Sequence, residues 1–403
     1  MTPSISNEQL LAVARQYGTP LYVYHAETIA HQYHKLKTAF SVLNARIFYA
    51  CKALTNIAVL RYINQLGCGA DCSSSNEVQL ALLAGFTPDR ILYTSNGIAF
   101  AEIEEVAQKG VHVNIDSLSN LEKFGRRFGS SYPVGVRLRP NIMAGGNLKI
   151  STGHSKSKFG IPVEQLDELL RIADTYQLNI RTLHIHTGSD IKDADVFVRG
   201  LEVLFDVVPH FPHLEVLDLG GGFKVPYHPD EKETDVVQLG LRLRDALQQH
   251  ETTRHRNLQV WFEPGKYLVS ACGYLLSTVN VLKQNGDVQI AGIDTGLNHL
   301  IRPMMYDAYH HICNISNPDA PQQPYMVTGN VCETDTFADN RLLPQVREGD
   351  VLAICNAGAY GFEMSSNYNA RFRPAEVLFE NGTPRLIRRR DTLEDLLRNQ
   401  ITD

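Results

Sequence analysis

A lysine stands inside an apolar stretch near the start of the chain. Lys52 lies in the run FYACKAL, where every neighbour is apolar or small. Burying an ammonium group is costly unless its charge is paired or lost, so a lysine here either reaches solvent or has a lowered pKa. A lysine with a lowered pKa can form an imine with a carbonyl compound. The residue pattern alone leaves both interpretations of Lys52 open.

Three further groups of residues fit an imine-forming lysine. Gly220, Gly221 and Gly222 in LDLGGGF would let backbone amides approach a phosphate, although a tight turn explains them equally well. Glu263 in WFEPG could pair with a ring nitrogen or form an ordinary salt bridge, and His186 in LHIHTGS could lie flat against a ring. The combination is more specific than any member. It matches pyridoxal phosphate (PLP), which carries an aldehyde, a phosphate and a ring nitrogen.

Short apolar runs alternate with amphipathic runs around these residues, which is typical of β/α units. Eight predicted strands with seven helices between them favour an α/β fold, a (β/α)8 TIM-type barrel over residues 27–268. A doubly wound open sheet is the rival, but no GxGxxG opens a helix after the first strand. The predicted strands are 45–53, 68–72, 91–95, 111–116, 133–140, 181–189, 214–222 and 258–265; the helices are 56–66, 77–85, 101–109, 119–128, 162–176, 193–208 and 236–249.

The rest of the chain is predicted to form a β-sheet-rich domain from residues 1–26 and 269–403. After about residue 266 the sequence changes to short β-like runs, among them GYLLSTVNVLK, VQIAGID and AEVLF. Asn285-Gly286 and Asn381-Gly382 predict hairpin turns. LYVYHA, which precedes the barrel, is also β-like and is expected to join this sheet.

The composition excludes several function classes. Of the 403 residues, 43% are hydrophobic and 20% charged, which is ordinary for a globular protein with a sizeable core. The net charge is -6, and the one basic run, at 388–390, is short and followed by acidic residues, so no nucleic-acid partner is expected. The first residues lack a signal-peptide pattern and no run of about twenty apolar residues occurs, so no membrane association is expected either.

The seven cysteines show no zinc-like spacing, so no metal site is expected. Reduced thiols in a cytoplasmic protein explain them best.

The motifs also resemble a known family. The chain is similar to the fold type III PLP-dependent decarboxylases, which share the alanine-racemase-like architecture, and within them to the members that act on diaminopimelate. The resemblance extends from residue 21 to residue 379. Its motifs are FYACKAL, GCGADCSSSNEVQLALLAGF, STGHSKSKFGI, LHIHTGSD, LDLGGGF, EPGKYLV, IDTGLNHLIRPMMYDAYHHI, GNVCETD and NAGAYGFEMSSNYNARFRPAEV.

The resemblance implies a cofactor role for each barrel residue. Lys52 would carry PLP as a Schiff base, His186 would stack on its ring, and Glu263 would keep the ring nitrogen protonated. Ser189 would hold the phosphate together with the three glycines. Three further residues match the family's cofactor pocket, although the second could simply cap its helix: Asp71, Ser74 and Gly265.

The resemblance also implies a homodimer with shared active sites. Cys332 would donate a proton to the substrate carbanion from the partner subunit, although a buried structural thiol is the commoner fate of a cysteine. Tyr360 would reach the phosphate and substrate, and Glu333 would bind the substrate's distal ammonium. Arg302 and Tyr306 would bind its distal carboxylate, unless Arg302 is only an interface salt bridge.

Two departures from the family pattern bear on the substrate. Lys266 stands where the family has an arginine that contacts the substrate or phosphate. A lysine cannot form the arginine's two-pronged contact, but it can still pair with a carboxylate, so Lys266 is expected to bind the substrate. Asn147 stands where the family has a histidine.

The expected reaction is decarboxylation of meso-2,6-diaminopimelate to L-lysine and CO2. A cation, an anion and a phenol suit the zwitterionic far end of that small-molecule substrate. Alternatives are a same-fold decarboxylase of ornithine, arginine, carboxynorspermidine or a related amino acid, an amino-acid racemase, and a non-catalytic regulator.

Overall fold

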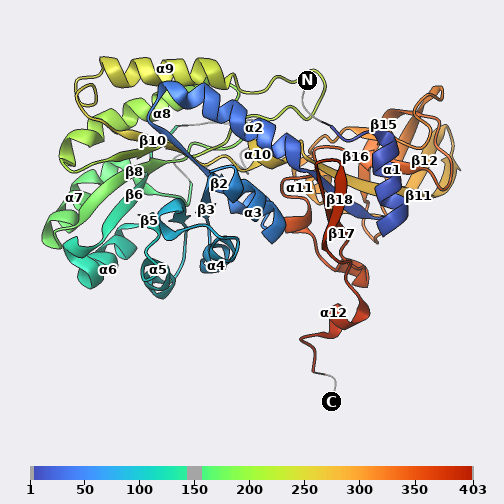
Figure 1. Ribbon diagram of the computed structural model, residues 1–403, viewed down its shortest axis with the longest axis horizontal. Helices are drawn as coiled ribbons and strands as arrows, with labels where there is room; N and C mark the ends of the chain where they lie inside the picture. The colour runs from blue at the N-terminus through green and yellow to red at the C-terminus, as the bar shows by residue number, and fades with distance from the viewer. Residues whose placement is uncertain (1–3, 143–156, 402–403) are drawn as a thin grey trace. The chain divides into compact units, whose positions relative to one another are not determined.

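The computed structural model describes residues 4–142 and 157–401, which form two compact units (Figure 1). The barrel unit consists of Gln32–Val225 and Lys232–Tyr267. The sheet unit consists of Met1–His31, Pro226–Glu231 and Leu268–Asp403. The sheet unit is therefore assembled from three separate stretches of chain.

Eight parallel strands close into a barrel, as the sequence predicts. They follow one another around the barrel in chain order, and closure comes from pairing of the last strand with the first. A ninth, two-residue strand, β7 (Ile161–Pro162), pairs beside β6. The barrel strands are β2 (Ala45–Ala50), β3 (Gly69–Cys72), β4 (Ile91–Thr94), β5 (His112–Ile115), β6 (Pro133–Arg139), β8 (Asn179–Ile185), β9 (Val216–Asp218) and β10 (Gln259–Phe262).

The seven predicted helices are present between these strands, and side-chain caps fix where several of them begin. Ser74 accepts a hydrogen bond of 3.1 Å from the Glu77 amide at the start of α4, and Asp235 accepts one of 3.0 Å from Gln238 at the start of α9. The helices are α3 (Ile57–Gln65), α4 (Ser75–Leu83), α5 (Phe100–Ala107), α6 (Leu118–Phe128), α7 (Leu166–Thr175), α8 (Ala194–Val207) and α9 (Val236–Gln249), and two more, α2 (Ala26–Ala39) and α10 (Lys266–Val269), flank the barrel sequence.

Several strands end earlier than predicted, at the edge where the candidate site lies. The strand predicted over 45–53 stops at Ala50, and Cys51–Ala53 form a 3-10 turn. The strand predicted over 214–222 stops at Asp218, because Gly220 and Gly222 adopt positive φ angles of 66° and 96°, which no extended strand allows. The predicted helix over 162–176 begins later, at Leu166, after a 3-10 turn.

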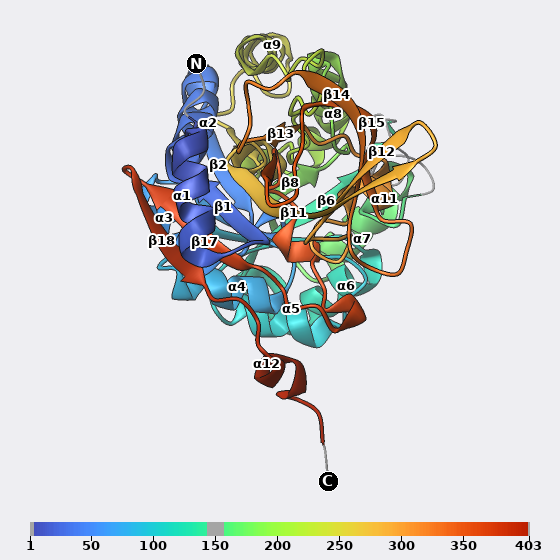
Figure 2. The same ribbon diagram turned by 90° about the vertical axis from the view of Figure 1, so that its right-hand side faces the viewer.

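The sheet unit contains a nine-stranded mixed sheet (Figure 2). β1, which contains LYVYH, pairs antiparallel with β11 and parallel with β17, so its expected place in this sheet is confirmed. Both predicted hairpins are present, between β11 and β12 and between β17 and β18. The strands are β1 (Leu21–His25), β11 (Gly273–Asn285), β12 (Val288–Ile293), β13 (Ile312–Asn314), β14 (Gln322–Thr328), β15 (Thr336–Pro344), β16 (Val351–Ile354), β17 (Ala375–Glu380) and β18 (Thr383–Arg388).

Three short helices accompany this sheet: α1 (Asn7–Tyr17), α11 (Arg302–Tyr306) and α12 (Leu393–Leu397). The apolar face of α1 packs on the sheet, where Leu10 and Val13 join a buried cluster with Val23, Leu276 and Val377. Burial of such side chains is the main stabilising contribution to a small sheet of this kind. Over residues 4–142 and 157–401, no helix combines the length and apolar character that crossing a membrane requires.

Candidate active site

Lys52 lies in the turn that follows β2, at the carboxyl end of the barrel strands. Its side chain is 46% exposed, and its Nζ lies 3.9 Å from Oδ2 of the buried Asp71 at the end of β3. Of the two interpretations left open by the sequence, exposure of the amine is the one observed. Burial raises the pKa of Asp71, and the carboxylate of Glu263 adds to the rise, whereas Lys52 opposes it.

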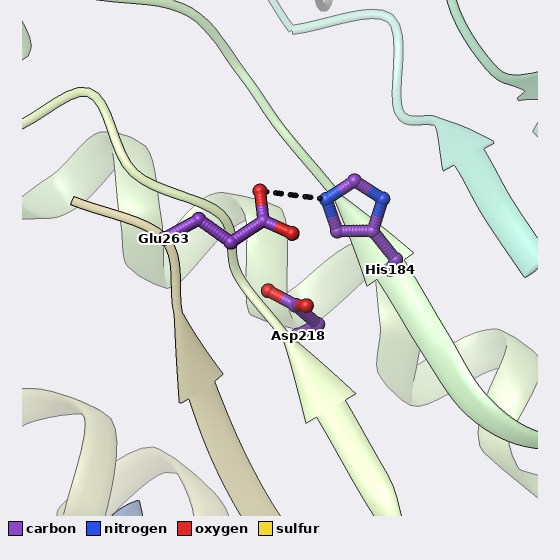
Figure 3. Close-up of side chains that lie close together, drawn as sticks. All are labelled: His184, Asp218 and Glu263. Atoms are coloured by element: carbon purple, nitrogen blue, oxygen red, sulfur yellow. Dashed lines mark ion pairs between the residues drawn. The ribbon is translucent and has the colours of Figure 1, made fainter. Parts of the chain in front are cut away.

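Three buried side chains converge at the ends of β8, β9 and β10 (Figure 3). The Nε2 atom of His184 lies 3.3 Å from Oε2 of Glu263, and Asp218 approaches both, with one donor atom from each residue within 4.8 Å of the others. Burial alone would raise the pKa of Glu263, but His184 and Lys52 outweigh it and leave that pKa well below its usual value. Glu263 is therefore the ionised member of the group.

Burial acts against the charged form of each of the other two members. Burial raises the pKa of Asp218 well above its usual value, and the nearby negative charge of Glu263 adds to the rise. Burial lowers the pKa of His184. Of the two histidines near the end of β8, His184 contacts Glu263 and His186 contacts the glycine loop. Stacking of His186 on the cofactor ring stays a prediction.

The glycine loop after β9 is tied to its neighbours on both sides. Nδ1 of His186 accepts a hydrogen bond of 3.2 Å from the Gly221 amide, and Asp218 Oδ1 accepts one of 2.9 Å from the Gly220 amide. A Cβ atom at Gly221 would lie 2.2 Å from the Glu263 carbonyl oxygen, and one at Gly222 would lie 2.0 Å from the Gly188 carbonyl oxygen. Only glycine fits here, whether or not the loop holds a phosphate.

The pKa of His186 is well below its usual value, because the ring is desolvated and Arg137 and Lys52 add positive potential. A neutral imidazole is suited to stacking on an aromatic ring. Ser189, the expected phosphate ligand, is half-buried in the loop after β8, three residues beyond His186.

Lys266 is buried, and its ammonium forms an ion pair with Asp190 from the loop after β8. The lysine that replaces the family's arginine therefore has a counterion within the barrel unit. Its neighbour Gly265 lies against the Lys52 turn, because a Cβ there would be 3.0 Å from Cβ of Ala50 and 3.2 Å from Cβ of Ala53.

Sequence reasoning missed two charged residues of this site. Arg137 on β6 is buried with its guanidinium 4.7 Å from the ring centre of Phe159; burial lowers its pKa, whereas Glu263 and Asp116 raise it. Asp218 is the other. The available signals were an arginine inside the apolar strand PVGVRLRP and an acid directly before the glycines in LDLGGG.

The remaining expected residues belong to the sheet unit. Cys332 and Glu333 are exposed on the loop before β15, where the Cys332 amide donates to Asn369 Oδ1 at 2.9 Å and Glu333 accepts from the Tyr368 hydroxyl at 2.8 Å. Tyr360 is half-buried and has a φ of 54°. Asn147, the second departure from the family, lies outside the described residues.

Arg302 begins α11 and is 9% exposed, with its guanidinium carbon 5.2 Å from the ring centre of Tyr227 and 5.8 Å from that of Tyr306. Among the residues that the structure describes, no acceptor reaches its buried Nε. A buried guanidinium of this kind is suited to binding an anionic ligand.

The barrel unit fits PLP on three independent grounds. Lys52 offers a reachable amine, Glu263 offers a buried anion, and the glycine loop offers a cradle that any Cβ would fill. In addition, buried oxygens of Asp71, Asp218 and Glu263 lack a hydrogen-bond partner among the described residues. An aldehyde, a ring nitrogen and a phosphate are the groups that such an arrangement accommodates. The fold and site thus define a PLP-binding barrel of fold type III.

Comparisons with known proteins agree with the assignment of a PLP-binding barrel. Residues 26–270 match the family of the pyridoxal-dependent decarboxylase, pyridoxal binding domain. Diaminopimelate decarboxylase of Methanothermobacter thermautotrophicus is 40% identical over 98% of this chain and 95% of its own length, and that of Escherichia coli K12 is 34% identical over 98% and 96%. The structure of the Helicobacter pylori diaminopimelate decarboxylase complexed with L-lysine has a TM-score of 0.88 at 31% identity, covering 96% of this chain and 98% of that one.

The chain belongs to the pyridoxal-dependent decarboxylases, in the branch of the diaminopimelate decarboxylases. The resemblance noted in the sequence, the barrel with its added sheet domain, and the dependence on PLP are thereby confirmed. The protein is a PLP-dependent amino-acid decarboxylase.

Proposed function

We propose that this enzyme decarboxylates meso-2,6-diaminopimelate to L-lysine and CO2. The observation that carries the proposal is Arg302, a buried guanidinium whose Nε has no acceptor among the described residues. A substrate whose far end carries a carboxylate satisfies that guanidinium, and a plain diamine tail does not. The exposed carboxylate of Glu333 adds a site for the far ammonium.

Each proposed residue then has one task. When bound, PLP supplies an electron sink for the charge left on the α-carbon after CO2 departs. Lys52 provides the amine that attaches the cofactor, and ionised Glu263 pairs with its ring nitrogen. The Cys332 thiol donates a proton to the α-carbon. Arg302 and Tyr306 hold the far carboxylate of the substrate.

A second candidate is decarboxylation of an amino acid without a far carboxylate, such as ornithine. The ion pair between Lys266 and Asp190 favours it, because the lysine that replaces the family's arginine already has a counterion. The racemase alternative is disfavoured because Glu263 is ionised, and an anion keeps the ring nitrogen protonated, which suits the full carbanion of decarboxylation.

Carbon dioxide release from meso-diaminopimelate, lysine, ornithine and arginine separates these candidates. We expect turnover of diaminopimelate with lysine as the product. The Arg302→Met variant should raise KM for diaminopimelate by roughly tenfold to a hundredfold, since a charge-assisted hydrogen bond is lost. Turnover of ornithine together with no lysine formed from diaminopimelate would refute the substrate assignment.

We further propose a cytoplasmic homodimer in which residues 27–268 form the cofactor domain and residues 1–26 and 269–403 contribute to the interface. The exposure of Cys332 and Glu333 supports shared active sites, because each side chain is available to a partner subunit. All seven cysteines are free, which is typical of a reducing compartment.

A further inference from the structure

Two buried carboxyl groups, those of Asp218 and Glu263, point toward each other at the ends of β9 and β10 (Figure 3). Asp218 ends β9 and is 0% exposed, and Glu263 follows β10. One oxygen of each already has a contact: Asp218 Oδ1 accepts from the Gly220 amide at 2.9 Å, and Glu263 Oε2 lies 3.3 Å from His184. The other oxygens, Asp218 Oδ2 and Glu263 Oε1, are buried with no partner among the described residues.

A single proton satisfies both remaining oxygens. One oxygen of each carboxyl group lies within 4.8 Å of an oxygen of the other. Two ionised carboxylates this close would repel each other and would both lack solvation, so one of them stays protonated. The acid then donates a hydrogen bond to the anion. The surroundings select Asp218 as the acid, because Glu263 is the carboxyl group that contacts His184 and is stabilised by Lys52.

We propose that Asp218 is a positioning residue, held as a neutral carboxylic acid that donates a hydrogen bond to Glu263 and so keeps the ring nitrogen of PLP protonated. Each carboxylate oxygen has more than one lone pair, so Glu263 can accept from Asp218 and from the ring at once. A hydrogen bond donated to Glu263 makes it a weaker base. The ring nitrogen therefore remains the stronger base of the two.

The proposal rests on PLP binding to this barrel, and the charged groups around the pair are consistent with it. From the neighbouring strands, Lys52, Asp71, Arg137 and His186 face Glu263 or Asp218. Burial, together with the charge of Glu263, raises the pKa of Asp218.

A divalent cation is the competing explanation for the same donors. His184, Asp218 and Glu263 offer one nitrogen and two carboxylates within 4.8 Å of one another. A cation there would require both carboxyl groups to be ionised and would occupy the anion that the ring nitrogen needs. Metal analysis of the purified enzyme distinguishes the two, because a stoichiometric divalent ion that is lost from an Asp218→Asn variant would overturn the proposal.

The decisive measurement is the nitrogen-15 NMR signal of enzyme reconstituted with ring-labelled PLP. Asp218→Asn retains an acceptor for the Gly220 amide and a donor for Glu263, whereas Asp218→Leu retains neither. We expect the ring nitrogen to remain protonated in the wild type and in Asp218→Asn. In Asp218→Leu its signal should move toward the unprotonated position, and the Kd for PLP should rise about tenfold.

Asp350→Leu is the matched control, since Asp350 is also a buried carboxyl but belongs to the sheet unit, where Asn314 donates a hydrogen bond of 3.0 Å to it. Its ring-nitrogen signal should match the wild type. A visible imine absorption band reports cofactor binding separately, so its absence from the wild type defeats the cofactor assignment itself. A normal band with an unprotonated ring in Asp218→Asn defeats only the inference about Asp218.

Infrared spectroscopy gives a second test that needs only the conservative variant. The difference spectrum of wild type and Asp218→Asn should show loss of the carbonyl stretch of a protonated carboxyl group. Loss of carboxylate bands alone would show that Asp218 is ionised and would overturn the proposal, even if Asp218→Leu fails to fold.

Discussion

The side chain of Lys52 is accessible for a reason that the sequence did not show. Its place in an apolar run raised the question of a buried amine, but the chain turns at Cys51 and leaves the side chain 46% exposed. The amine is therefore reachable by an aldehyde without any opening of the barrel. Its partner Asp71 is the buried member of the pair, so the cost of burial falls on the carboxyl group.

The position of a residue that follows a single strand could be predicted from the sequence. The contacts of a residue with charges on several other strands could not. Lys52 and Glu263 each follow an apolar run, which placed them at the carboxyl edge of the barrel. Arg137 and Asp218 acquire their significance only from charges on three other strands. No local pattern in PVGVRLRP or LDLGGG reveals those neighbours.

The ion pair between Lys266 and Asp190 should contribute to the stability of the barrel. Replacing either residue alone, by Lys266→Met or Asp190→Asn, leaves the other charge partly buried and should lower the free energy of unfolding by about 1–3 kcal/mol. The double variant should lose less than the sum of the two. Urea denaturation of all four proteins measures the coupling, and strictly additive losses would show that the pair contributes nothing.

At the scale of elements, the glycine loop after β9 excludes other residues more by the lack of space for a Cβ atom than by its backbone φ angles. Gly222 has a φ of 96°, and an added Cβ would lie 2.0 Å from a carbonyl oxygen of the β8 loop. Gly349 has a similar φ of 89°, but an added Cβ would have no atom within 4 Å. Substitutions at these two positions therefore separate the cost of backbone strain from the cost of a steric clash.

Gly349→Ala should lower the free energy of unfolding by about 1–2 kcal/mol, the usual cost of a left-handed conformation. Gly222→Ala should cost clearly more and should weaken PLP binding as well, because the loop must move away from Gly188. Chemical denaturation and titration with PLP test both variants. Equal losses in the two would mean that the loop accommodates a side chain.

The loop that carries Cys332 is fastened by Asp335. The buried Asp335 carboxylate accepts from the Leu297 amide at 2.7 Å, and its backbone oxygen accepts from the Gly329 amide at 2.7 Å. Burial raises the pKa of Asp335 from 3.8 to about 6, although the backbone N–H groups of Leu297 and Val331 oppose the rise. The anchor of this loop therefore titrates close to neutral pH.

Two consequences of this titration can be measured. Because the folded pKa lies above the unfolded value, the folded protein binds more protons between these values, and the contribution of Asp335 makes the free energy of unfolding fall as pH rises from about 4 to about 6. Below about pH 6 the neutral carboxyl is a weaker acceptor for the Leu297 amide than the carboxylate is, so this local hydrogen bond of the Cys332 loop weakens even though the folded protein as a whole is stabilised, and kcat/KM should decline there. Both effects should disappear in Asp335→Asn, and an unchanged pH profile in that variant would contradict this role.

The strands and helices were predicted well because each is an apolar or amphipathic run with a recognisable end. The errors lie at the carboxyl ends of β2, β8, β9 and β10, which stop short of the predicted residues 53, 189, 222 and 265. At these ends the chain turns because of its backbone φ angles and its close contacts with adjacent strands. The periodicity of apolar residues in the sequence carries no information about either. β7 was missed because two residues show no period at all.

At the scale of the molecule, the proposal of shared active sites leads to a prediction about mixed subunits. A Lys52→Ala protein and a Cys332→Ala protein should each lose nearly all activity. If the two residues act in one site from different subunits, mixing them with subunit exchange should restore up to about a quarter of the wild-type activity per dimer, because only one of the two sites in a mixed dimer is intact and half of the dimers are mixed. Carbon dioxide release measures this. No recovery despite proven exchange would place both residues on one chain.

The assembly of the sheet unit from three separate stretches of chain was predicted only in part from the sequence. Its first and last stretches were predicted from their β-like runs, but the short excursion at Pro226–Glu231 was not. That segment contains no strand or helix, and its place comes from side-chain contacts such as the 2.9 Å hydrogen bond between Tyr227 and Ser270.

The position of β1 has a consequence for synthesis on the ribosome. All five residues of β1 are buried in the finished sheet, yet both of its partners, β11 and β17, come from the last third of the chain. The eight barrel strands, between Ala45 and Phe262, are complete before β11 is made. Throughout that interval the nascent chain displays LYVYH as an unpaired apolar segment, a natural target for chaperones. Release of the finished C-terminus, rather than closure of the barrel, is then the event that completes folding.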